Sequence, residues 1–283
     1  MIELDLAKKH LALQQLSRLV ADSVFRPISR KYDAREHEYP KELDVLASII
    51  DGLNESGAGA SAKLEKSPDE AASDPQRARN GANMATVVGT MELCRGDVGL
   101  LLTLPRQGLG NAALAAVGTP EQKAQYADAW ISMAITEPSA GSDSAAIRAT
   151  ARLDGDEWVL NGEKIFVTAG ERANGIVVWA SLDKSLGRAA IKSFFVPQGA
   201  PGMRLVRLDH KMGIRASDTA VLEFVNCRIP KDNILGSAEI DTKKGFGGVM
   251  QTFDNTRPLV AGMAVGVSRA ALEVIRALLA KAG

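Results

Sequence analysis

The hydrophobic period of the sequence changes twice along the chain, and this constrains the fold more than any other feature. Up to about residue 130, apolar residues recur at helical spacing, and this spacing returns from about residue 246. In between, apolar and polar residues alternate as in strands, with Asp154-Gly155 and Asn161-Gly162 as signals for tight turns. The pattern predicts an α+β protein with a helical domain over 1–130, a mostly antiparallel β domain over 131–240 and a further helical part over 241–283.

Local signals place the ends of several elements. The first helix is expected to end at Pro27, because proline lacks the N–H that a helix interior needs. Residues 54–81 are rich in turn-forming residues and are predicted to form a long surface loop. Thr119 and Gln122 have the spacing of a capping box, which predicts a helix from Thr119 to about Trp130.

Charge and composition exclude several classes of function. The 34 basic and 34 acidic residues balance and aromatic residues make up 5% of the chain, which argues against nucleic-acid binding. No apolar run is long enough to span a bilayer and no secretory signal is visible, so a cytoplasmic protein is expected. Cys94 and Cys227 are far apart and the three histidines are scattered, so neither a disulfide nor a metal site is expected.

Two motifs that contain glycine could hold a phosphate group. The run 108–113 matches G-x-G-x-x-A, but no strand leads directly into Gly108, so a turn between helices explains it better. In the segment 133–143 (MAITEPSAGSD), an apolar stretch enters small and polar residues, and Gly141 and Ser142 would let backbone N–H groups approach an anion. An ordinary transition from strand to loop accounts for the same residues.

At this segment the sequence resembles the acyl-CoA dehydrogenase flavoprotein family, and four further segments resemble that family in the same order. The five segments are 118–123, 133–143, 160–170, 211–230 and 253–258. The resemblance as a whole extends over about residues 107–275. The resemblance implies an N-terminal helical domain, a middle β-barrel domain and the start of a C-terminal four-helix bundle, with FAD in the cleft between barrel and bundle.

The resemblance also implies which residues contact the cofactor and the substrate. Thr136 would hydrogen-bond the pyrimidine edge of the flavin, Thr168 would hydrogen-bond its N5 atom, and Phe166 would pack on its ring. The implied cofactor-binding residues are Met133, Ile135, Thr136, Gly141, Ser142, Phe166 and Thr168. The implied substrate-binding residues are Ser142, Asp254 and Arg257. A purely structural interpretation also stands, with both threonines as ordinary strand residues and Phe166 as a core aromatic.

The family's reaction is the α,β-dehydrogenation of an acyl-CoA thioester, in which a carboxylate base takes the α-proton and the β-hydride goes to flavin N5. No residue of this chain is assigned as the base. The resemblance implies that the base lies on helices expected after Gly283, and the family's alternative position is occupied here by Thr256.

Three interpretations follow. The favoured one is an acyl-CoA dehydrogenase present as a fragment or as one half of a split enzyme. The second is a non-catalytic subunit that completes a partner's site in a hetero-oligomer, and the third is a flavin oxidase or monooxygenase on the same fold. The implied partners are an acyl-CoA substrate, an electron-transfer flavoprotein as electron acceptor, and further subunits of a homo- or hetero-oligomer.

Overall fold

The computed structural model describes the chain except for residues 1–5, 7, 56–80, 106–108, 243–245 and 283. The chain divides into two compact units. The helical unit comprises Met1–Leu104 with Arg257–Gly283, and the β unit comprises Pro105–Thr256. The predicted loop at 54–81 falls almost wholly outside the described residues. The domain boundaries at 130 and 240 stay predictions.

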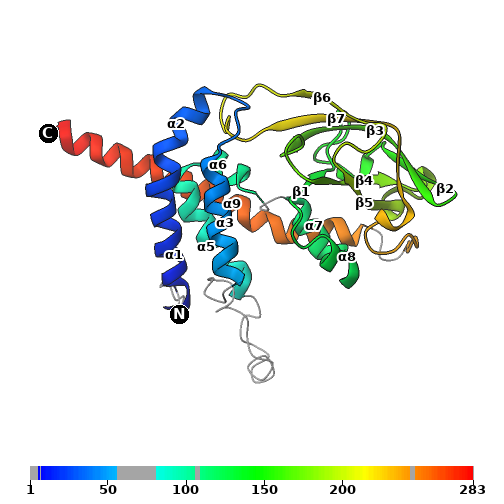
Figure 1. Cartoon of the computed structure of the whole chain (residues 1–283), viewed down its shortest axis with the longest axis horizontal. Helices are drawn as coiled ribbons and strands as arrows, with labels where there is room; N and C mark the ends of the chain where they lie inside the picture. Colours follow the sequence, from blue (N-terminus) through cyan, green and yellow to red (C-terminus); the bar gives the residue numbers. More distant parts are fainter. Residues whose placement is uncertain (1–5, 7, 56–80, 106–108, 243–245, 283) are drawn as a thin grey trace, which may run out of the picture. The chain divides into compact units, whose positions relative to one another are not determined.

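The helical unit is built from six helices and a π-helical turn within its described residues (Figure 1). The elements are α1 (Lys8–Val20), the π turn η1 (Ala21–Phe25), α2 (Arg26–Ala34), α3 (Glu42–Glu55), α5 (Gly81–Gly96), α6 (Val98–Thr103) and the later part of α9 (Gly247–Ala282). The expected helix end at Pro27 is wrong. Pro27 lies in the first turn of α2, directly after the π turn η1, in which the Arg26 N–H donates to the Ala21 carbonyl oxygen, and the chain stays helical through η1 into α2.

Helix α9 packs on α5 through two glycines. A Cβ added at Gly266 would lie 2.3 Å from the Met91 carbonyl oxygen, and one at Gly262 would lie 3.4 Å from Val87. The glycines therefore allow the two helix backbones to approach closely. The helix predicted from residue 246 is confirmed, but Pro258 lies inside it and not at its start.

The apolar side chains of α9 lie mostly on its exposed surface. Their exposed fractions range from 45% to 66% for Val260, Val265, Val267, Leu272, Val274, Ile275, Leu278 and Leu279. By length and composition alone, α9 is also apolar enough to cross a membrane, contrary to the expectation that no segment is. Two charged residues of α9, Arg269 and Glu273, form ion pairs with α5.

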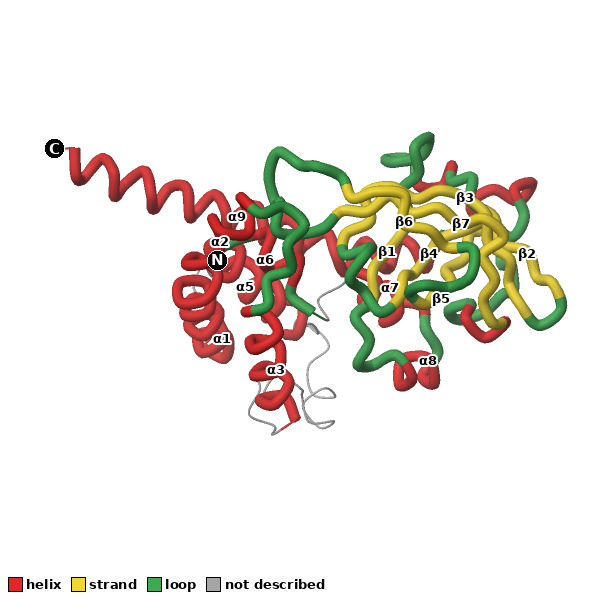
Figure 2. Tube along the Cα trace, turned by 45° about the horizontal axis from the view of Figure 1, so that its top comes forward, coloured by secondary structure: helices red, strands yellow, loops and turns green. Residues whose placement is uncertain are grey.

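The β unit contains a curled, mixed seven-stranded sheet, drawn in yellow in Figure 2. Its strands are β1 (Ile131–Ala134), β2 (Thr150–Asp154), β3 (Glu157–Thr168), β4 (Gly175–Ser181), β5 (Ile191–Pro197), β6 (Met203–Leu208) and β7 (Thr219–Pro230). The strand order is β1-β4-β2-β3-β7-β6, with β5 paired to β4. β1 and β2 pair with β4 in parallel, and the other pairs are antiparallel. The predicted α+β class, with helices before and after a curled sheet, is confirmed.

Two short helices precede the sheet. They are α7 (Leu109–Val117) and α8 (Pro120–Gln125). Both hydrogen bonds of the capping box predicted at Thr119 and Gln122 are present, although α8 ends earlier than expected. Gly110 of α7 lies against β1, because a Cβ there would be 2.2 Å from the Ser132 carbonyl oxygen. This glycine serves close packing of helix on strand, consistent with the rejection of a dinucleotide fingerprint.

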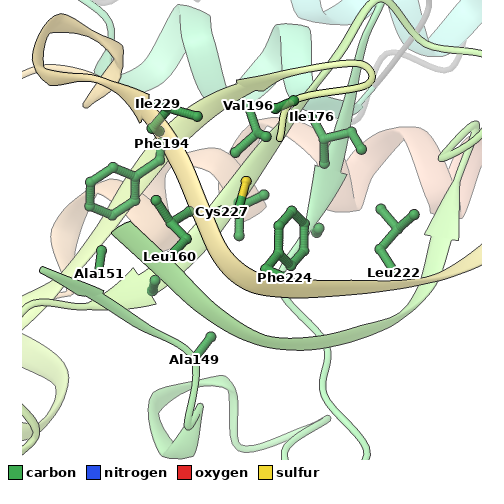
Figure 3. Close-up of a cluster of buried hydrophobic side chains, with 14 of the residues drawn as sticks. Ala149, Ala151, Leu160, Ile176, Phe194, Val196, Leu222, Phe224, Cys227 and Ile229 are labelled. Atoms are coloured by element: carbon green, nitrogen blue, oxygen red, sulfur yellow. The ribbon is translucent and has the colours of Figure 1, made fainter. Parts of the chain in front are cut away.

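The strands contribute to two clusters of buried hydrophobic side chains, and the sheet encloses the first of them. Figure 3 shows Phe194, Leu160, Phe224 and Cys227 among its buried side chains.

Burial raises the pKa of the Cys227 thiol to about 11, and burial with the nearby Asp97 charge raises the pKa of the Cys94 thiol to about 12. Both cysteines are free and buried.

The turn expected at Asn161-Gly162 is wrong. β3 runs without interruption from Glu157 to Thr168, and the pairing of β3 with β7 shifts register between Leu160 and Gly162. Gly162 has φ 150°, and a Cβ there would lie 2.7 Å from the Ala149 Cβ. The glycine signals a β-bulge with a close contact, which the sequence does not distinguish from a turn.

Candidate functional site

A cavity of about 210 Å³ opens in the β unit. The described residues that line it are Leu109, Met133, Ile135, Thr136, Gly141, Ser144, Ile165, Phe166, Thr168 and Phe253. Six of the seven predicted cofactor-binding residues are among them. The seventh, Ser142, is exposed and does not line the cavity. The walls are mainly apolar, with three hydroxyl-bearing residues between them.

A second bulge in β3 directs its side chains into the cavity. The register with β7 shifts again between Lys164 and Val167, and Phe166 has φ 59°. As a result Ile165, Phe166 and Thr168 all line the cavity, while Val167 is fully buried in the core. A regular strand would send neighbouring residues to opposite faces. Bulges of this kind re-aim side chains and occur often beside active sites.

Phe166 is 64% exposed, so it is not a core aromatic. A positive φ is unfavourable for a bulky residue and persists only where the surrounding structure enforces it. The bulge therefore holds a large aromatic ring at the rim of the cavity at a cost in backbone energy. This excludes the structural interpretation that the sequence left open at this position.

The end of β3 is fixed by hydrogen bonds on both sides of Thr168. The Ser132 hydroxyl donates to the Thr168 carbonyl oxygen at 2.5 Å, and the Ala169 N–H donates to the Asp218 carbonyl oxygen at 3.2 Å. The buried Asp218 carboxylate also accepts from the Glu171 N–H and pairs with Arg172. The segment 211–220 thus holds the strand end that presents Thr168.

A buried ion pair lies directly behind the cavity wall. Lys164 Nζ is 2.7 Å from Glu137 Oε1, and the two side chains are 0% and 4% exposed. Burial lowers the pKa of Lys164 to about 8, while the Glu137 carboxylate opposes this shift. Neither residue was predicted from the sequence as part of the site. Their signal was a charged residue inside each of the two motifs that line the cavity.

The other predicted residues do not line the cavity. Asp254 and Arg257 are both exposed on α9, and Arg257 belongs to the helical unit. Phe253, one residue before Asp254, does line the cavity and was not singled out from the sequence. Thr256 is buried, and its hydroxyl donates to the Phe253 carbonyl oxygen at 3.4 Å.

Known proteins resemble this chain in sequence and in fold. Residues 132–227, which include most of the cavity wall, match the family described as "Acyl-CoA dehydrogenase, middle domain". The chain is 34% identical to the short-chain specific acyl-CoA dehydrogenase of Bos taurus mitochondria over 281 residues, which are 95% of this chain and 62% of that protein. It thus spans less than two thirds of that relative's length.

Solved structures show the same fold. Butyryl-CoA dehydrogenase from Megasphaera elsdenii superposes with a TM-score of 0.80 at 28% identity, over 96% of this chain and 69% of that one. A glutaryl-CoA dehydrogenase from Mycobacterium smegmatis in complex with FADH2 gives 0.75 at 27% identity, over 96% and 65%.

Proposed function

Because the chain belongs to the acyl-CoA dehydrogenase family, we propose that it is part of an enzyme that dehydrogenates an acyl-CoA thioester with FAD, and that the cavity of its β unit takes the flavin ring. One observation carries the proposal. Six residues from two motifs about 25 residues apart in the sequence line a single cavity. The activity is that of the whole protein, of which these residues form the cofactor-holding part.

The cavity suits the ring system of a flavin in size and chemistry. Its volume of about 210 Å³ lies below the roughly 300–1,000 Å³ typical of sites for whole ligands, so it suits part of a dinucleotide. Apolar side chains match the faces of an aromatic ring, and Thr136 and Thr168 can donate to its polar edge. At Gly141 a Cβ would meet nothing within 4 Å, so the backbone there is open to an approaching group.

The bound flavin would supply the acceptor for the substrate hydride. The residues of this chain orient and shield that acceptor. Met133, Ile135 and Phe166 exclude water from the ring, and the hydroxyls of Thr136 and Thr168 fix its orientation. Precise orientation of reacting groups supplies much of the rate enhancement of enzymes.

The proton-abstracting base is not among the residues that shape the cavity. None of its described lining residues carries a carboxylate. Glu137 lies nearby, but its oxygens already accept from the Arg148 N–H at 2.6 Å, the Ala149 N–H at 2.9 Å and Lys164. This favours, as a second candidate, a non-catalytic subunit that holds flavin and completes a partner's site.

Flavin binding and the reduction of bound flavin by the substrate test the proposal separately. The purified chain is titrated with FAD, followed by the visible absorption of bound flavin, and then with butyryl-CoA without oxygen. We expect saturable binding, weakened by Thr136→Val and Thr168→Val and unchanged by Thr150→Val, a strand threonine outside the cavity. Loss of the flavin absorbance on adding butyryl-CoA supports dehydrogenation by this chain itself. Bound flavin that stays oxidised places the base outside this chain, as both the part of a larger enzyme and the non-catalytic subunit require. A folded chain that binds no flavin contradicts both.

The further expectations from the sequence and from the family resemblance are part of the same proposal. They are an electron-transfer flavoprotein as acceptor, an oligomer and a cytoplasmic location. Rapid reoxidation of the reduced flavin by oxygen would instead support the oxidase or monooxygenase interpretation.

A further inference from the structure

The ion pair of Glu137 and Lys164 joins the two walls of the cavity. Glu137 follows Ile135 and Thr136 on one wall, and Lys164 precedes Ile165 and Phe166 on the other. Lys164 Nζ also donates to the Ile135 carbonyl oxygen at 3.0 Å, and the Ile165 N–H donates to the Thr136 carbonyl oxygen at 2.9 Å. Three polar contacts therefore cross from one wall to the other within two residues of the pair.

Glu137 also fixes the loop that follows it. Its backbone exchanges hydrogen bonds with Ala140 at 2.9 and 3.1 Å, which closes a tight turn directly before Gly141. Its carboxylate accepts from the backbone of Arg148 and Ala149, which tethers the turn to the segment leading into β2. The cavity residues Gly141 and Ser144 lie between these two attachments.

Such a pair adds little net stability to a fold. Burying two charges costs about as much as their attraction returns, and replacing a buried pair by apolar residues is often neutral or stabilising. A buried pair with every oxygen bonded does define geometry sharply, because each alternative arrangement leaves a charge unpaired in a low-dielectric interior.

We propose that the ion pair of Glu137 and Lys164 positions the two walls of the cavity. It sets the distance between Thr136 on one wall and Phe166 and Thr168 on the other. The two residues act through these neighbours and do not themselves touch the cofactor. This inference rests on the proposed function and deepens it.

The test separates positioning from folding. In the double variant Glu137→Gln with Lys164→Met, neither charge is left unpaired, so the β unit keeps its fold. The links from Lys164 to Ile135 and Glu137 are gone, and so is one of the two side-chain bonds to the Arg148 and Ala149 N–H groups, because an amide NH2 cannot accept. Glu157→Gln is the matched control, because Glu157 lies on the same strand and pairs with Arg228 at an exposed site. The readouts are hydrogen exchange of the Ile165 amide without flavin, and the dissociation constant and visible band shape of bound FAD.

We expect the double variant to melt within a few degrees of the wild type. Its Ile165 amide should exchange at least about tenfold faster and its Kd for FAD should rise about tenfold or more, since misplaced binding groups lose most of their effect. The control should change neither quantity. A double variant with wild-type exchange at Ile165 and wild-type FAD affinity would overturn the proposal.

A second variant covers the case in which the double variant does not fold. Glu137→Asp keeps both charges and shortens the reach of the carboxylate by one methylene. We expect an intermediate rise in the exchange rate of the Ile165 amide and in the Kd for FAD. If both quantities keep their wild-type values, the proposal is overturned. If the wild-type chain binds no FAD, the proposed function fails, and the Ile165 exchange still decides whether the pair positions the wall.

Discussion

Phe166 combines a large aromatic side chain, high exposure and a left-handed backbone conformation. For residues other than glycine this conformation costs roughly 1–2 kcal/mol. Neither its packing nor its backbone therefore explains why phenylalanine is present, and a role at the cavity does. Residues held in such conformations cluster at functional sites.

Replacing Phe166 should separate stability from function. We expect Phe166→Gly to unfold with a free energy about 1 kcal/mol higher than that of Phe166→Ala, because glycine adopts positive φ without strain. Both variants should bind FAD more weakly than the wild type, since the ring that covers the cavity is lost. Urea unfolding of the flavin-free chain and FAD titration measure the two effects. Equal stability of the glycine and alanine variants would show that the bulge stores no strain.

For single residues, the sequence predicted which positions belong to the motifs, but not the directions in which their side chains lie. Met133, Ile135, Thr136 and Thr168 were assigned through the resemblance of their segments to the acyl-CoA dehydrogenase family, and the residues by themselves allowed an ordinary strand. The bulge that brings Ile165 to the same side as Phe166 depends on pairing with β7, about sixty residues further along the chain. Strand alternation alone would have placed them on opposite faces.

Elements with local signals were predicted well, and elements fixed by distant contacts were not. The capping box at Thr119 involves only residues three apart. The same Gln122 side chain donates to the Ile234 carbonyl oxygen at 2.7 Å, which no local rule reveals. Pro27 and Gly162 were misread because a proline or glycine marks a special backbone position without saying which one.

The contact between α2 and α3 predicts a pH effect. Hydrogen bonds from Lys31 and Tyr32 lower the pKa of Glu42 from 4.5 to about 2. Because the folded pKa lies below the unfolded one, the carboxylate stabilises the fold above pH 4.5 and this contribution is lost as the pH falls toward 2. The Glu42 side chain is 39% exposed, so solvent screening reduces the effect to about 1 kcal/mol.

Glu42→Gln should therefore lower the free energy of unfolding by about 1 kcal/mol at neutral pH, and by progressively less in acid. Urea unfolding of both proteins at several pH values measures the difference. Glu38→Gln, at an exposed pair with Arg35, is the control and should have little effect. A difference that stays constant from neutral pH to pH 3 would contradict the assignment.

Arg95 is one of the residues that join helix α9 to the rest of the helical unit. Its guanidinium is 3% exposed and lies 2.6 Å from Asp22 and 2.7 Å from Glu273. Removing Arg95 takes away the buried cation and leaves Asp22 and Glu273 with the longer pairs to Arg26, at 3.5 Å each. We expect Arg95→Met to destabilise the helical unit by about 3 kcal/mol, and Arg35→Met, at its exposed pair, to cost less than about 1 kcal/mol. Thermal unfolding followed by circular dichroism compares them, and equal effects would contradict a special role for the buried cluster.

For the whole molecule, the two units offer separate spectroscopic signals. All three tryptophans, Trp130, Trp158 and Trp179, lie in the β unit, whereas most helical residues lie in the helical unit. Tryptophan emission therefore reports on the β unit, and the helical circular dichroism reports mainly on the other.

We expect Arg95→Met to lower the melting temperature seen by circular dichroism and to leave that seen by tryptophan emission nearly unchanged. Compact units with their own buried side chains can open separately. Thermal scans of the same sample with both probes measure this. Transitions that move together by the same amount would show that the chain unfolds as one cooperative unit.

The burial of both cysteines makes the native chain nearly inert toward thiol reagents. Thiols react as thiolates, and raised pKa values of about 12 and about 11 keep Cys94 and Cys227 protonated at neutral pH. A single cysteine introduced in place of Phe166 would then be the group that a maleimide dye labels. Its labelling rate would fall whenever a molecule covers the rim of the cavity. The labelling rate of this variant would therefore report whether the cavity is occupied.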